Sequence, residues 1–279
     1  MIAKTLKILN LKMSNELPFV MIGGPCAIES KSHALFVGEK TKEICDGLGI
    51  GYIFKASFDK ASRTSIYGPR GIGLDEGLEV LAEVREKLEV PVQTDVHLPS
   101  QCEAVAQAVD IIQIPSFLCK HTDLLEAAAK TGKPVNVKKG QFMSPYEMDH
   151  VVTKLNHFGT EDVILTDRGS CFGYNALVVD FKGIPIMTKT GHPVIFDATH
   201  SVQTPASHGK FSGGDRDFSP FLARAAIGVG VAGIFLEVHD NPDRAPCDGA
   251  NMLHIKSLKQ LLVELMELDA VSKKFMRFV

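Results

Sequence analysis

The stretch "DIIQIPSFLCKHTDLLEAAAKTGKPVNVKK" (residues 110–139) decides the fold class, because it holds one complete unit of strand, helix and strand. Its two ends, "DIIQIP" and "KPVNVKK", are short apolar runs rich in β-branched residues. Between them, "TDLLEAAAKTG" carries apolar residues at three- and four-residue intervals, as an amphipathic helix does. Because the apolar residues of the end runs are largely continuous, each strand is expected to be buried on both faces. The stretch therefore predicts a parallel sheet covered by helices.

The same unit recurs along the whole chain. Eight strand-like runs are present: residues 18–22, 51–55, 90–96, 110–115, 133–139, 161–167, 192–198 and 232–238. Helix-like segments between them include residues 32–49, 75–89, 102–110, 122–132 and 144–159. Eight such units predict an α/β protein of the (β/α)8 TIM-barrel type. An open doubly wound sheet is the alternative, but no GxGxxG motif follows the first run.

The chain shows no sign of division into domains. No linker rich in Pro or Ser interrupts it, and 279 residues suit one large barrel. We expect a single domain over residues 1–279. Residues 1–18 are expected to be a short N-terminal extension with a hairpin around "LNLKMSNE".

Composition narrows the class of partner. The net charge is -3 and the pI is about 6.4, which argues against a general nucleic-acid surface. No apolar run is long enough to span a membrane and no signal peptide is evident, so we expect no membrane partner and a cytoplasmic location. The six cysteines are scattered without CxxC pairs, and we expect them to be thiols.

Each strand-like run ends in, or is followed by, a polar or reactive residue. In chain order these residues are Cys26, Lys55, Asp95, Gln113, Lys138, Arg168, His200 and Glu237. A single charged residue at a strand end usually only marks the surface. In a barrel, however, the carboxyl ends of all strands meet on one face, where active sites are built. The order predicts an active site on that face.

Five cations are expected at this mouth: Lys55, Lys60, Arg63, Lys138 and Arg168. Gathering positive charge in a concave site is electrostatically costly unless an anion fills it, so they indicate a substrate with phosphate and carboxylate groups. Solvated lysines on the barrel rim are the alternative.

A second set of residues indicates a divalent metal. Cys26, His200, Glu237 and Asp248 offer a thiolate, an imidazole and two carboxylates, which suit Zn, Fe, Mn or Co and do not suit Mg or Ca. His97, His208 and His239 are competing ligand candidates, and a lone cysteine such as Cys26 is usually only a small buried hydrophobe.

Several long motifs in the same order resemble one enzyme family. They are "KASFDKASRTS" (55–65), residues 110–145, "LTDRGSCFGYNALVVDF" (165–181), "FDATHSVQ" (196–203) and "SGGDR" (212–216). Together they resemble the 3-deoxy-D-manno-octulosonate 8-phosphate synthases, from about residue 20 to beyond residue 250. The resemblance implies a (β/α)8 barrel assembled as a homotetramer. It also implies condensation of phosphoenolpyruvate with arabinose 5-phosphate and water, a step in lipopolysaccharide synthesis.

The resemblance also assigns roles to residues. Lys138 and Arg168, with Gln113 nearby, would hold the phosphate of phosphoenolpyruvate, and Lys55 and Lys60 would face its carboxylate. The sugar phosphate would be bound by Arg63 and Thr64, with Asp95 on a hydroxyl and Ser57 in the same site. Lys60, His200 and Asp248 are the catalytic candidates. Cys26 in "GPCAIES" resembles the metal-dependent branch of the family, whose other ligand positions match His200, Glu237 and Asp248, whereas the metal-independent branch has Asn at the first position.

One motif departs from the family pattern. In "KASRTS" (60–65), Ser62 and Thr64 stand where Asn and Ser are usual, and "RTS" resembles the related synthase that uses erythrose 4-phosphate. That synthase is therefore one alternative, although the motif keeps its six-residue length and Thr64 keeps a hydroxyl. A non-catalytic barrel that binds sugar phosphates is a second alternative.

Overall fold

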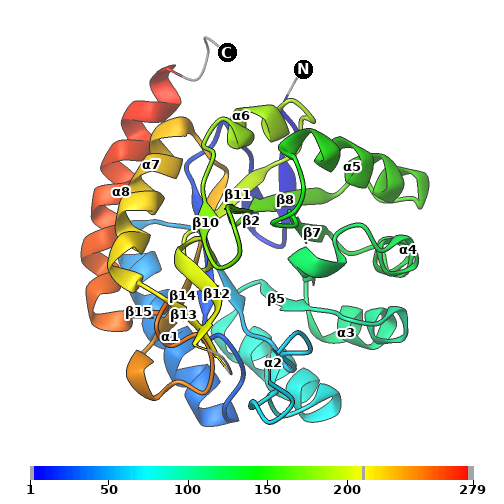
Figure 1. Cartoon of the computed structure of the whole chain (residues 1–279), viewed down its shortest axis with the longest axis vertical. Helices are drawn as coiled ribbons and strands as arrows, with labels where there is room; N and C mark the ends of the chain where they lie inside the picture. Colours follow the sequence, from blue (N-terminus) through cyan, green and yellow to red (C-terminus); the bar gives the residue numbers. More distant parts are fainter. Residues whose placement is uncertain (1–2, 64, 209–210, 276–279) are drawn as a thin grey trace.

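The chain folds into a closed parallel β-barrel inside a ring of helices in a computed structural model that describes residues 3–63, 65–208 and 211–275 (Figure 1). The barrel strands are β3 (Val20–Gly24), β4 (Tyr52–Lys55), β5 (Val92–Asp95), β6 (Ile111–Ile114), β7 (Val135–Lys138), β8 (Val163–Asp167), β11 (Val194–Asp197) and β14 (Gly233–His239). Each pairs in parallel with the next, and β14 pairs with β3 to close the barrel. The (β/α)8 prediction is confirmed, and the open sheet is excluded.

Eight α-helices cover the outside. They are α1 (Lys31–Leu48), α2 (Leu74–Leu88), α3 (Cys102–Ala108), α4 (Thr122–Lys130), α5 (Met148–His157), α6 (Gly183–Thr188), α7 (Ser219–Val229) and α8 (Ile255–Phe275) among the described residues. Six 3-10 turns join the elements: Pro99–Gln101, Ser116–Leu118, Pro145–Glu147, His200–Val202, Arg216–Phe218 and Pro242–Arg244. No described helix combines the length and the apolar character that a membrane span needs.

Local sequence signals set the helix ends. In α1, the Ser30 side chain accepts a hydrogen bond from His33 N, which satisfies one of the free N–H groups of the first turn. The same helix ends at Gly49, whose φ of 70° is the left-handed conformation that glycine adopts without strain. The packing of α4 follows its sequence period, because Leu124, Leu125 and Ala128 are buried against the barrel.

Two apolar layers stabilise the fold. The larger one lies between the strands and the helices. The smaller one fills the amino-terminal part of the barrel interior and includes Ile22, Ile53 and Phe235. Leu6 and Met13 belong to this inner layer and come from a hairpin of β1 (Leu6–Ile8) and β2 (Leu11–Met13), so the hairpin packs against the barrel interior.

Three shorter pairings lie at strand ends. β9 (Ser170–Cys171) pairs with β10 (Leu177–Val178), and β15 (Leu253–His254) runs parallel to the end of β14. A ribbon of β12 (Gln203–His208) and β13 (Phe211–Gly214) follows β11, and it is drawn in yellow in Figure 1. These short pairings belong to the loops that follow the barrel strands, and such loops form the active sites of (β/α)8 barrels.

Candidate active site and metal centre

The strand period delivers the polar side chains to the carboxyl end of the barrel. Ile53 and Phe235 belong to the inner apolar layer, and side chains two residues apart on a strand point to the same side. Lys55 and Glu237, each two residues further on, therefore also point inward, just above that layer. Both are almost completely buried, with exposures of 2% and 0%. The buried polar site is a consequence of the same alternation that builds the core.

A cavity of about 350 Å³ opens at this end, a size that suits a small-molecule site. Its lining includes all five predicted cations, namely Lys55, Lys60, Arg63, Lys138 and Arg168, together with Asp95, Gln113, His200 and Asp248. Ser57, although buried beneath, is hydrogen-bonded to three of the groups around the cavity. Thr64, predicted to bind the sugar phosphate, lies outside the described residues.

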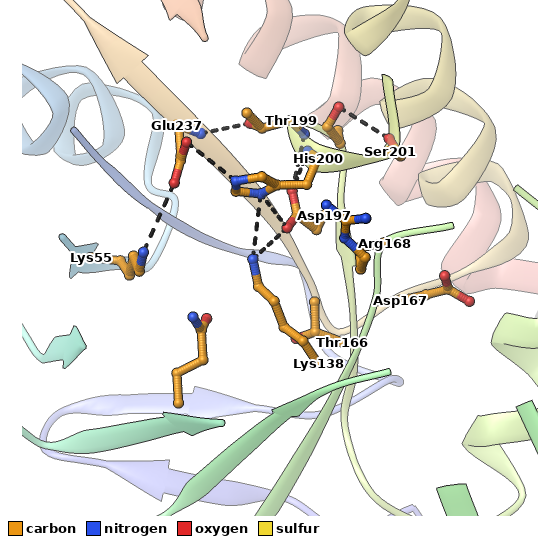
Figure 2. Close-up of polar contacts among 12 residues, drawn as sticks. Lys55, Lys138, Thr166, Asp167, Arg168, Asp197, Thr199, His200, Ser201 and Glu237 are labelled. Atoms are coloured by element: carbon orange, nitrogen blue, oxygen red, sulfur yellow. Dashed lines mark hydrogen bonds and ion pairs between the residues drawn. The ribbon is translucent and has the colours of Figure 1, made fainter. Parts of the chain in front are cut away.

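Asp197 links Lys138 to His200 in the centre of the site, as Figure 2 shows. Its Oδ2 lies 2.5 Å from Lys138 Nζ and 2.7 Å from His200 Nδ1. Burial alone would favour a protonated Asp197, yet His200 and Lys138 hold the pKa of this carboxyl well below its ordinary value. Burial lowers the pKa of Lys138, and Asp197 opposes that shift. The pair is therefore an ionised anchor that orients the imidazole.

A second network centres on Ser57. Its Oγ accepts hydrogen bonds from Lys55 Nζ at 2.8 Å and Lys60 Nζ at 3.0 Å, and it donates to Asp95 Oδ1. Burial opposes charge on Asp95, but Lys55 and His97 hold its pKa well below the ordinary value. Burial also disfavours charge on Lys60, whereas Glu237 raises its pKa. Lys60 therefore keeps its positive charge at one wall of the cavity, where Lys55 lies beside it.

Arg168 is a further cation in the lining of the cavity. The guanidinium donates from Nη2 to Gln203 Oε1 at 2.9 Å, while its buried Nη1 has no hydrogen-bond partner among the described residues. Burial lowers the pKa of Arg168 from its very high ordinary value. A buried guanidinium nitrogen without a partner is costly, so it indicates an anion that accepts from it.

Three predicted metal ligands meet beside the cavity. The donor atoms of His200, Glu237 and Asp248 all lie within 4.8 Å of one another, and His200 Nε2 is 3.5 Å from Glu237 Oε2. Neither carboxylate oxygen of Glu237 has a hydrogen-bond partner within the described part of the chain. A buried carboxylate left without partners is strongly disfavoured. Its lone pairs are therefore available to a cation.

Cys26 joins this group through Asp248. Its Sγ is 3.1 Å from Asp248 Oδ2, and the thiol of Cys247 lies in the same small cluster. Burial raises the pKa of Cys26 well above its ordinary value, so the thiol keeps its proton unless a cation offsets the charge. Burial opposes ionisation of Asp248, but His200 and Lys60 lower its pKa to about 2.

The donor set fits a divalent transition metal. One sulfur, one imidazole nitrogen and two carboxylates suit borderline ions such as Zn or Fe, and the Glu237 oxygens accept no hydrogen bond among the described residues, which leaves lone pairs for a metal. Of the competing histidines, His97 pairs with Asp95 and His239 lies in a different cluster. The side chain of His208 lies outside the part that the structure describes.

Asp197 and Cys247 are among the residues of the site that sequence reasoning missed. Asp197 ends β11 two residues after Ile195 of the inner layer, so the strand period could have identified it. Cys247 precedes Asp248, but its approach to Cys26 brings together residues more than 200 positions apart, which no local signal reveals.

Comparison with known proteins identifies the family of the chain. The model of the DAHP synthetase I family matches residues 4–274, and the chain belongs to that family. Within it, the chain is 52% identical to the 2-dehydro-3-deoxyphosphooctonate aldolase of Granulibacter bethesdensis, over 97% of this chain and 96% of the relative. Proteins of the same name from Rickettsia rickettsii and Rickettsia prowazekii are 51% and 52% identical, over 97% of this chain and 99% and 98% of theirs.

Proposed function

We propose that this protein condenses phosphoenolpyruvate with D-arabinose 5-phosphate and water, giving 3-deoxy-D-manno-octulosonate 8-phosphate and inorganic phosphate. The observation that carries the proposal is the convergence of five cations on one cavity. Two phosphates and a carboxylate are the anions that such a cavity would balance. The relatives are named for an octonate, which favours the eight-carbon product over the alternative that uses erythrose 4-phosphate. The product would serve lipopolysaccharide synthesis.

Phosphoenolpyruvate would lie along the cationic walls. We assign its phosphate to Lys138 and Arg168, whose Nη1 has no partner among the described residues, with Gln113 beside them. Its carboxylate would face Lys55 and Lys60, which share Ser57 Oγ as an acceptor. A bidentate Arg and compact Lys charges suit a phosphate and a carboxylate respectively.

The aldose would occupy the outer part of the cavity. Arg63 lines it there, and its buried Nη2 has no partner among the described side chains, so it is assigned to the sugar phosphate. Thr64 would add a hydroxyl donor. Asp95, held ionised by Lys55 and His97, is assigned to a sugar hydroxyl, with Ser57 beside it.

Cys26, His200, Glu237 and Asp248 would hold a divalent Zn, Fe, Mn or Co ion. When bound, such an ion supplies Lewis acidity toward an oxygen of water or of the aldehyde. Asp197 fixes the His200 ring through Nδ1, which leaves Nε2 facing Glu237. Gln203 Nε2 donates to Asp248 Oδ1 at 2.9 Å and orients that carboxylate.

The proposed reaction forms one carbon–carbon bond and releases phosphate, and the cations of the cavity stabilise the charge that develops. Carbon 3 of phosphoenolpyruvate attacks the aldehyde carbon, and a water oxygen attacks carbon 2. The resulting hemiketal phosphate loses inorganic phosphate by carbon–oxygen cleavage. Lys138 and Arg168 stabilise the charge that grows on the departing phosphate. We assign to Lys60 the transfer of protons between the water, the aldehyde oxygen and the leaving phosphate, and to His200 and Asp248 a catalytic role as ligands of the metal.

Assembly as a homotetramer is part of the proposal. Phe117, Phe142, Phe172 and Tyr174 are largely exposed, in segments that follow β6, β7 and β8, and Phe117 also lines the cavity. Large exposed aromatic side chains are typical of surfaces that a partner covers, and here the partner would be another copy of the chain. We also place the protein in the cytoplasm, since all six cysteines are unpaired.

Phosphate release tests the enzyme against the binding alternative. Purified protein should release inorganic phosphate only when both phosphoenolpyruvate and arabinose 5-phosphate are present. Binding of either anion without release under any divalent metal would instead establish the non-catalytic barrel.

A further inference from the structure

A second group of potential ligands lies outside the cavity, among the residues that the structure describes. It consists of Glu29 in the loop after β3, His33 in the first turn of α1, and His239 and Asp240 at the end of β14. None of the four lines the active-site cavity. We refer to these four residues as the His33–His239 cluster.

One oxygen of Asp240 faces both imidazole rings. Asp240 Oδ1 lies 3.0 Å from His33 Nε2 and 3.0 Å from His239 Nδ1. The ring centroids are 4.5 Å apart, with an angle of 45° between the ring planes. Asp240 can accept the Nε2–H of His33, which leaves the lone pair of that ring on Nδ1. His239 Nδ1 lies near the same oxygen without a hydrogen bond to it.

The other two ring nitrogens, His239 Nε2 and His33 Nδ1, both face Glu29. Glu29 Oε1 is 2.7 Å from His239 Nε2 and 3.8 Å from His33 Nδ1, and the three donor atoms lie within 4.8 Å of one another. His33 Nδ1 is buried and has no hydrogen-bond partner among the described residues. The cluster thus gathers two imidazole nitrogens and a carboxylate oxygen at one point.

We propose that Glu29, His33 and His239 bind a second divalent transition metal, with Asp240 as the carboxylate that orients the His33 imidazole. Metal-bound histidines usually donate their other N–H to a carboxylate, and Asp240 is positioned to accept it from His33. Two nitrogens and one oxygen suit Zn, Co or Ni and not Mg or Ca, which prefer oxygen ligands alone. Three protein ligands leave a further position for water.

The backbone offers one competing contact. Asn241 N lies 2.8 Å from His239 Nδ1 and donates to it in the tautomer that carries its hydrogen on Nε2. That tautomer donates from Nε2 to Glu29 and cannot bind a cation there. Cation binding therefore requires the other tautomer and a turn of the ring away from Asn241 N, which would bring Nδ1–H to Asp240 Oδ1, 3.0 Å away. This competition makes Asp240 a positioning residue with a measurable effect on affinity.

The second site lies on the same two chain segments as the first metal site. Glu29 follows Cys26 by three residues, and His239 follows Glu237 by two on β14. The two sites differ in chemistry, however, since only the first contains a thiol. Bound Co²⁺ distinguishes them, because a thiolate ligand adds an intense near-ultraviolet charge-transfer band and the second site would give only weak visible bands.

The experiment is a Co²⁺ titration of the full-length chain after exhaustive chelation, with metal content measured beside the spectrum. The unmodified protein should bind a second ion per chain that adds nothing to the thiolate band. His33→Ala and Glu29→Gln should lose that ion, and Asp240→Asn should weaken it roughly 10–100-fold. His150→Ala, a change at an exposed histidine of α5, is the matched control and should bind as the unmodified protein does.

Each result shows whether the His33–His239 cluster binds a metal ion, and none depends on a measurement of catalysis. Loss of the thiolate-independent ion in Glu29→Gln, with circular dichroism unchanged, supports the site even if His33→Ala does not fold. Equal metal content and affinity in the unmodified protein, His33→Ala and Glu29→Gln would overturn it. The proposal would also be overturned if the unmodified protein bound only the ion that gives the thiolate band.

Discussion

Glu237 Oε2 lies 3.5 Å from His200 Nε2, and neither oxygen of Glu237 has a hydrogen-bond partner among the described residues. A fully buried carboxylate is stabilised by cations close to it, and its unused lone pairs can also bind a metal ion. The nearest lysine nitrogens, Lys55 Nζ and Lys60 Nζ, are both 3.9 Å from Oε1, beyond hydrogen-bond distance. The relationship is the structural basis for the proposed metal centre.

Metal dependence is the first prediction. Exhaustive chelation should abolish phosphate release, and added Mn, Co, Zn or Fe should restore it to different extents. Cys26→Ser should bind metal poorly because a hydroxyl is a much weaker ligand than a thiolate. Cys102→Ser is the control, since this buried thiol belongs to the core between strands and helices. Full activity in metal-free protein would refute the metal role, and the barrel and its cationic cavity would remain.

The second prediction concerns Arg168. Arg168→Ala should weaken the handling of phosphoenolpyruvate by about 1.5–3 kcal/mol in kcat/KM, because it removes a charge-assisted contact to phosphate. Arg224→Ala, which breaks a surface ion pair with Glu264 on the helical ring, is the control and should leave the kinetics unchanged. Unaltered kinetics in Arg168→Ala would remove this residue from the substrate site.

The third prediction concerns the anchor of the site. Asp197→Asn should lower the free energy of unfolding by about 3–5 kcal/mol, because Lys138 then stays buried without its ionised partner. Activity should fall as well, since His200 loses the carboxylate that orients its ring. Denaturant unfolding beside kinetics measures both effects. A variant with native stability would show that the Asp197–Lys138 pair is not a net stabilising contact.

How stability varies with pH is the fourth prediction, and it rests on His192. Burial, and then the charge of Lys4, lowers the pKa of this imidazole from 6.5 to about 4 in the folded chain. Between those values the unfolded chain binds more protons, so stability should be complete above about pH 6.5 and should be lost as pH falls toward 4. The contribution is roughly 2 kcal/mol after allowance for screening by solvent.

His192→Gln tests this dependence because it removes the titrating group. Urea unfolding of both proteins at several pH values between 4 and 7 gives the comparison. The difference in stability between them should change with pH across this window. A difference that stays constant would show that another group titrates.

The sequence predicted the barrel because each strand carries its own local signal. Continuous apolar runs and period-two placement together brought Lys55, Asp95 and Lys138 to one face, as the structure has them. The prediction was less exact at strand ends. The first run was placed at residues 18–22, whereas β3 is Val20–Gly24 and includes two glycines that carry no strand propensity.

Features that depend on tertiary contact were not predictable. The β12–β13 ribbon follows β11 in a segment rich in Gly and Ser, whose composition is typical of a loop. The His33–His239 cluster joins the start of one helix to the end of the last barrel strand, and only closure of the barrel between β14 and β3 brings them together. The unpartnered oxygens of Glu237 likewise become evident only in three dimensions.

The most direct test of the central claim offers the metal-loaded protein phosphoenolpyruvate with arabinose 5-phosphate and, separately, with erythrose 4-phosphate at the same concentration. Released phosphate and the mass of the organic product are followed together. The account predicts that phosphate and an eight-carbon sugar acid phosphate form in equal amounts from arabinose 5-phosphate, with much slower release from erythrose 4-phosphate. Equal or faster turnover of erythrose 4-phosphate, or no phosphate from either aldehyde, would contradict it.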